Sequence, residues 1–191
     1  LVLRRPLPAR GSSPPVLTAD SGKLRAWARG QVDDILAQVR TTASGTAPDL
    51  AESREQLGAA TLALHEASNR SPLRGDLRLS LWWSTQALAA VDPSPERLPE
   101  GIVPLLRSYL ERAESLAPYD RRRALVLVRT WLMAGDAGEA RRVSRDLLEF
   151  DSAKAQEVYD LLGGASLSLS DLMAATPNTP QAAAALAHYL A

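Results

Sequence analysis

Apolar residues recur along this chain at the three- and four-residue spacing of an amphipathic helix, and this periodicity limits the possible folds more than any other feature. In the first half it predicts helices over residues 20–43, 49–69 and 71–91, the last with Ser71 as its cap and Pro72 in its first turn. The longest alternating stretch, Leu167–Ser170, is too short to predict a half-buried strand. We therefore predict an all-α fold: an irregular array of antiparallel helical hairpins with about seven to nine helices.

The second half of the sequence predicts six further helices, the last three short, over residues 102–117, 124–133, 137–149, 152–162, 169–175 and 179–190. The segment from Ala124 to Ala155 combines two of them with an Ala-Gly-Asp turn, in which Asp136 is expected to cap the second helix. With small residues at Gly135 and Ala140, it resembles a tetratricopeptide-type hairpin, which implies two closely packed antiparallel helices. No second copy at a fixed period is found, so an irregular array is favoured over a regular solenoid.

Prolines divide the sequence into parts. Four of them fall within residues 6–15, which predicts an extended arm over residues 1–19. The proline-punctuated stretch 92–99 predicts a boundary between an N-terminal helical bundle (20–92) and a C-terminal hairpin array (98–191). One continuous domain over both is the alternative.

The charge balance argues against a nucleic-acid or anionic-membrane partner, because 22 basic residues offset 22 acidic ones. The sequence has no cysteine, which excludes thiolate chemistry. No uncharged apolar run is long enough to span a bilayer, and no signal peptide is recognised, so we expect a soluble, cytoplasmic protein. Because the first residue is Leu1, we also expect the sequence to be part of a longer protein.

Candidate groups for chemistry are few. His65 begins a zinc-protease-like His-Glu-x-x-His pattern, but Asn69 stands where the second histidine would be, so the helical face does not offer a pair of histidine ligands to a metal. The other histidine, His188, has no histidine near it in the sequence. The run 121–123 of arginines is interpreted as a solvated helix start rather than a nucleic-acid site. No catalytic residue, metal site or cofactor is predicted.

Two adjacent tryptophans, Trp82 and Trp83, stand out in a sequence that is 5% aromatic. Neighbouring helical residues point about 100° apart, so the two side chains cannot share the centre of one narrow stripe. Either both pack into neighbouring helices, or one anchors a protein partner. In the second case Arg70, Arg74 and Arg78, spaced four residues apart on one helical face, are expected to form its polar rim.

The same helix resembles the helical domain of bacterial GTPase-associated systems, a resemblance carried by Arg70, Leu77, Leu81, Trp82, Trp83 and Ala87. The resemblance implies a non-catalytic component of a bacterial conflict or defence system that works beside a GTPase.

We therefore predict a non-enzymatic helical adaptor or scaffold that binds a protein, either a GTPase partner or a second copy of itself. The alternative is a helical accessory domain of a larger enzyme or NTPase whose catalytic part lies outside this sequence.

Overall fold

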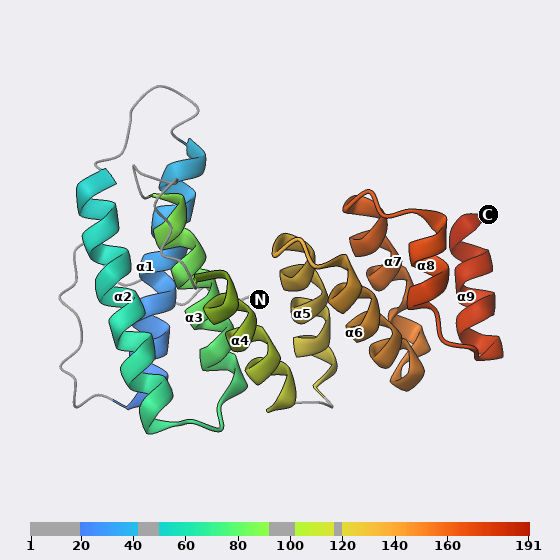
Figure 1. The fold of residues 1–191 in the computed structure, drawn as a ribbon, viewed down its shortest axis with the longest axis horizontal. Helices are drawn as coiled ribbons and strands as arrows, with labels where there is room; N and C mark the ends of the chain where they lie inside the picture. Colours follow the sequence, from blue (N-terminus) through green and yellow to red (C-terminus); the bar gives the residue numbers. More distant parts are fainter. Residues whose placement is uncertain (1–19, 42–49, 92–101, 117–119) are drawn as a thin grey trace, which may run out of the picture. The chain divides into compact units, whose positions relative to one another are not determined.

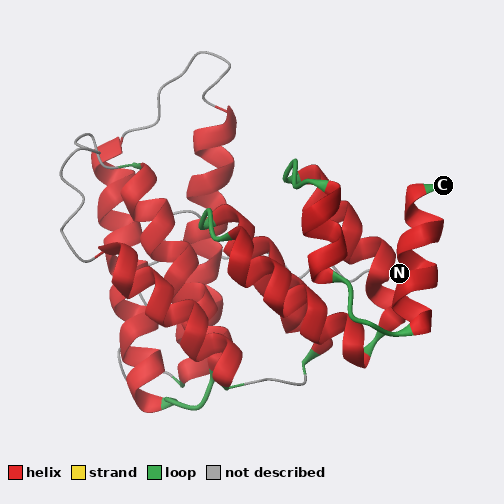
Figure 2. Ribbon diagram, turned by 45° about the vertical axis from the view of Figure 1, so that its right-hand side comes forward, coloured by secondary structure: helices red, strands yellow, loops and turns green. Residues whose placement is uncertain are grey.

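A computed structural model describes residues 20–41, 50–91, 102–116 and 120–191 of the protein (Figure 1). These residues form nine α-helices and one short 3-10 turn, and no strand occurs among them (Figure 2). The predicted all-α fold is confirmed. None of the helices in these ranges combines the length and the apolar character needed to cross a bilayer. The predicted arm 1–19 and the stretch 92–99 lie outside the described residues.

The described residues up to Leu116 form the first compact unit. Its helices are α1 (Ser21–Thr41), α2 (Leu50–Arg70), α3 (Gly75–Ala90) and α4 (Ile102–Ser115). Helices α1, α2 and α3 pack against one another, and α4 packs against α3. Val32 from α1, Leu57 from α2 and Ala87 from α3 meet in one buried apolar cluster, which joins these three helices in a common core.

The described residues from Asp120 to Ala191 form the second compact unit. It contains α5 (Arg121–Met133), α6 (Ala137–Phe150), the 3-10 turn η3 (Ser152–Lys154), α7 (Ala155–Gly164), α8 (Leu169–Ala175) and α9 (Pro180–Leu190). Helices α5 and α6 form a hairpin, and beyond it alternate helices meet: α5 contacts α7, α7 contacts α9, and α6 contacts α8. Helices α5, α7 and α9 therefore form one layer and α6 and α8 a second, as in stacked helical hairpins.

The turn between α5 and α6 forms as its sequence predicts. Gly135 adopts a φ of 77°, the left-handed conformation that glycine tolerates without steric cost. Asp136 then caps α6 by accepting a hydrogen bond from the backbone N–H of Glu139 at 3.1 Å. The polypeptide therefore reverses within a tight turn, and the two helices run antiparallel.

The start of α3 differs from the prediction. Residues 71–74 form a turn, closed by a hydrogen bond from the N–H of Arg74 to the C=O of Ser71 at 3.1 Å, so Ser71 does not cap the helix. Helix α3 begins at Gly75, with Arg74 in the N-cap position. The Arg74 guanidinium binds the Asp76 carboxylate at 2.7 Å, in the first turn, where a negative charge is favoured by the helix dipole.

The boundary between the two units also differs from the prediction, because the division falls after Leu116 rather than within 92–99. Helix α4 buries Leu106, Tyr109 and Leu110 and contacts α3. Burial of this face joins α4 to the first unit, although a proline-rich stretch separates the two helices in the sequence.

Candidate functional site

The two tryptophans of α3 have different surroundings. Trp82 is 1% exposed and belongs to the core of the first unit, whereas Trp83 is half-buried. Their rings meet edge to face, with centroids 5.0 Å apart and planes at 83°, an arrangement that aromatic quadrupoles favour. Trp82 therefore has almost no surface with which to contact a partner, and whether one of the two tryptophans anchors a partner stays a prediction. Of this pair, Trp83 alone presents surface.

The three arginines predicted as a polar rim do not share a helical face. Arg70 ends α2, Arg74 precedes α3, and Arg78 lies within α3, so the turn at 71–74 breaks their four-residue spacing. Arg70 Nε donates to Glu66 Oε1 at 2.8 Å. Arg78 Nε is buried and has no hydrogen-bond partner. The predicted common helical face is therefore wrong, whereas a role for these arginines beside a partner stays a prediction.

Asp76 connects α1 with the start of α3. One of its oxygens lies 2.7 Å from Arg74 Nη2 and 2.8 Å from Arg25 Nη1. The hydrogen bond to Asp76 raises the pKa of Arg74, an effect that desolvation opposes. Arg74 therefore holds the first turn of α3 in place and is not a free cation at the surface.

His65 links α2 to α4. Its Nε2 lies 2.9 Å from the Tyr109 hydroxyl, and the two rings meet edge to face with centroids 6.1 Å apart. Burial raises the pKa of the Tyr109 hydroxyl, which favours its neutral form. Throughout the parts of the protein that the structure describes, no three His, Asp or Glu side chains gather where they could hold a metal ion.

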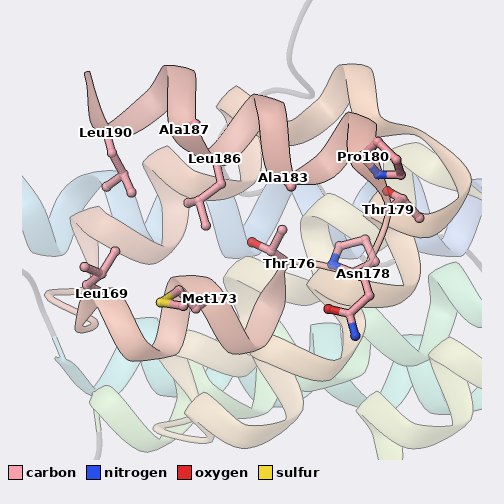
Figure 3. A pocket seen from close by; sticks show the side chains of 11 residues that line it. Leu169, Met173, Thr176, Asn178, Thr179, Pro180, Ala183, Leu186, Ala187 and Leu190 are labelled. Atoms are coloured by element: carbon pink, nitrogen blue, oxygen red, sulfur yellow. The ribbon is translucent and has the colours of Figure 1, made fainter.

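An apolar groove opens between α8 and α9 in the second unit (Figure 3). Its volume is about 600 Å³, and Leu169, Met173 and Leu190 on its walls are 52%, 61% and 52% exposed. Figure 3 shows Leu169 and Met173 of α8 facing Leu186 and Leu190 of α9. We call this the α8–α9 groove. It is lined by Leu169, Met173, Thr176, Pro177, Asn178, Thr179, Pro180, Ala183, Leu186, Ala187 and Leu190, none of them charged.

Tyr159, fully buried in α7, holds both walls of the α8–α9 groove. Thr176 Oγ1 donates its proton to the Leu172 C=O at 2.7 Å, so the oxygen is left to accept from the Tyr159 hydroxyl at 3.0 Å. On the other side, the Tyr189 hydroxyl of α9 donates to the Tyr159 C=O at 3.2 Å, and the two rings lie 5.2 Å apart. Through these contacts, Tyr159 holds both the end of α8 and the body of α9 in place.

Asp171 fixes the start of α8. Its carboxylate accepts from the hydroxyl and the N–H of Ser168, at 2.7 and 2.9 Å, and the Ser168 hydroxyl in turn accepts from the Asp171 N–H, which completes a capping box. The same carboxylate lies 2.5 Å from Arg141 Nη1 of α6. The hydrogen bonds from Ser168, and to a lesser extent the positive charge of Arg141, lower the pKa of Asp171 below its usual 3.8.

The lowered pKa predicts a pH-dependent difference between the wild-type protein and Asp171→Asn. A carboxylate whose pKa is lower in the folded state than in the unfolded state stabilises the fold at pH values above its unfolded-state pKa. This stabilisation is lost as the pH falls through the folded-state pKa. The variant is therefore expected to unfold more easily than the wild type at about pH 6, and the difference should vanish as the pH is lowered towards about 2. Amide hydrogen exchange of α8 across this range measures the effect, and a difference that stays constant with pH would contradict it.

The α8–α9 groove was not predicted, although the sequence carries a signal for it. From Leu172 to Ala191 there is no Asp, Glu, Lys or Arg, an unusual composition beside helices rich in charged residues. Leu169 and Met173 are four residues apart, as are Leu186 and Leu190, so each pair lies on one helical face. The spacing alone suggests buried faces, and only the packing shows that these faces remain uncovered.

Comparison of the sequence and the fold with protein-family models, with curated proteins and with solved structures finds no match.

Proposed function

We propose that this protein is a non-enzymatic helical adaptor and that it binds another protein through the α8–α9 groove. The observation that carries the proposal is the groove itself, whose walls expose half or more of three large apolar side chains, Leu169, Met173 and Leu190. An uncharged groove between two helices suits the apolar face of a third helix, with side chains three and four residues apart. The polar groups among its lining residues are hydroxyls and an amide, which can orient such a ligand without adding charge.

The groove is supported as a binding surface by the way its walls are held. Tyr159 fixes α9 and the end of α8, and Asp171 fixes the start of α8 on α6. Walls anchored by hydrogen bonds and an ion pair lose little conformational entropy when a ligand binds, which favours affinity.

A GTPase partner remains a prediction. Leu77, Leu81 and Trp82, three of the residues that carry the resemblance to GTPase-associated systems, are at most 1% exposed. Their spacing is accounted for by packing in the first unit, so they do not indicate which surface a GTPase would contact.

The proposal predicts that Met173→Asp weakens partner binding while the protein stays folded. Met173 is 61% exposed, so the substitution disturbs little packing but places a carboxylate among apolar walls, where an incoming apolar helix would have to desolvate it. We expect a loss of affinity of about tenfold or more. The matched control is Leu62→Asp, which puts the same charge on a 71% exposed leucine of α2 in the first unit.

The partner for this measurement is found by introducing a photo-crosslinking amino acid at position 173 and, as a control, at position 62. A discrete adduct from position 173, mapped by mass spectrometry to a helical segment with apolar residues three and four apart, would support the proposal. Adducts that are the same from both positions, or no adduct from position 173, would overturn it.

A further inference from the structure

The layered packing of the second unit indicates what kind of element fits the α8–α9 groove. Helix α6 contacts α5 from the other layer and α8 from its own. The groove is likewise lined by one helix of each layer, α9 and α8. A helix lying in the groove would therefore repeat the position that α6 occupies within the array, and this argues for a helix over an extended peptide.

The chemistry of the groove narrows the choice of helix. Because none of its lining residues is charged, the helix that fills it must present an uncharged face. Among the helices in the described ranges, α9 alone carries no Asp, Glu, Lys or Arg. Its groove-facing residues Ala183, Leu186, Ala187 and Leu190 follow the spacing i, i+3, i+4, i+7 of a single helical stripe.

We propose that the α8–α9 groove is a self-association surface, in which α9 of a second copy of this protein lies antiparallel to α9 and fills the groove. This inference rests on the proposed function, since it names the protein that the groove binds. A two-fold axis makes the contact self-complementary, because each α9 is at once a wall of one groove and the occupant of the other. Ala183 and Ala187 let the two helices approach closely, while Leu186 and Leu190 of each copy meet Leu169 and Met173 of the other.

Sedimentation velocity of the 191-residue protein over a range of concentrations tests the proposal. We expect a dimer whose fraction rises with concentration, and we expect Ala187→Glu to weaken dimerisation by about tenfold or more. Ala184→Glu is the matched control, because Ala184 is also exposed on α9 but does not line the groove. A wild-type protein that stays monomeric, or two substitutions with equal effects, would overturn the proposal.

Cysteine crosslinking gives the geometry of the contact. The protein has no cysteine of its own, so Ala187→Cys introduces a single thiol. In the antiparallel arrangement the two copies of this position lie close together near the two-fold axis, and mild oxidation is expected to give a disulfide-linked dimer, because Cα atoms within about 7 Å can be bridged. Ala184→Cys is expected to remain largely monomeric. Equal crosslinking of the two variants would contradict the arrangement.

The photo-crosslinking experiment separates the failure of this inference from the failure of the proposed function. If the protein is monomeric and position 173 crosslinks to the helix of a different protein, the self-association proposal is wrong and the adaptor proposal stands. If the protein is monomeric and position 173 gives no specific adduct, both are wrong.

Discussion

Replacing Trp82 by alanine is expected to lower the free energy of unfolding by about 3–5 kcal/mol, the usual cost of removing a large buried aromatic side chain. Trp82 is 1% exposed and packs edge to face against Trp83, so the substitution loses apolar burial, leaves a cavity and removes an aromatic pair. Urea unfolding followed by circular dichroism measures this change.

Trp83→Ala and Trp82→Phe are the controls for this prediction. Trp83 is half-buried, so its truncation should cost clearly less than that of Trp82. The indole N–H of Trp82 is buried without a hydrogen-bond partner, so phenylalanine removes an unsatisfied donor while it keeps most of the apolar volume. Equal losses for Trp82→Ala and Trp83→Ala would contradict the burial that the structure shows.

The second large effect is expected at Tyr159. Tyr159→Ala removes a fully buried ring that contacts Tyr189, together with the hydroxyl that binds Thr176, and should destabilise the fold by about 3–5 kcal/mol. Tyr159→Phe keeps the ring and the backbone carbonyl that Tyr189 binds, so it should cost only about 1 kcal/mol.

The two substitutions, Trp82→Ala and Tyr159→Ala, should each destabilise a different unit of the protein. Native-state hydrogen exchange should report faster opening of α7, α8 and α9 in Tyr159→Ala, and of α1, α2 and α3 in Trp82→Ala. We also expect Tyr159→Ala to impair binding at the α8–α9 groove, because both walls lose a contact. A variant that retains full protection of α8 and α9 would show that Tyr159 does not hold these walls.

The helices of this protein could be predicted because each has a continuous apolar face and many have readable ends. The Ala-Gly-Asp turn is an example, because it ends one helix and its Asp136 caps the next. Ser71 shows the limit of the same reasoning. Serine followed by proline has the composition of a helix start, but here the two open a turn and Arg74 stands before the helix.

The candidate site could not be predicted because it depends on which apolar faces remain uncovered. Apolar periodicity places Leu169 and Met173 on the apolar face of one helix, and it places Trp82 on the apolar face of another. Trp82 is nevertheless buried, whereas Leu169 and Met173 are exposed. The difference arises from tertiary packing, which sequence spacing does not encode. The same holds for α4, which joins the first unit through its contact with α3.

That contact has a practical consequence for anyone who wishes to produce the halves of this protein separately. A cut within residues 92–101 would separate α4 from α3. The C-terminal fragment would then expose Leu106, Tyr109 and Leu110 of α4, which makes it prone to aggregate, and the N-terminal fragment would expose the face of α3 that α4 covers. A cut between Leu116 and Asp120 keeps α4 with α3 and leaves the α5–α6 hairpin whole.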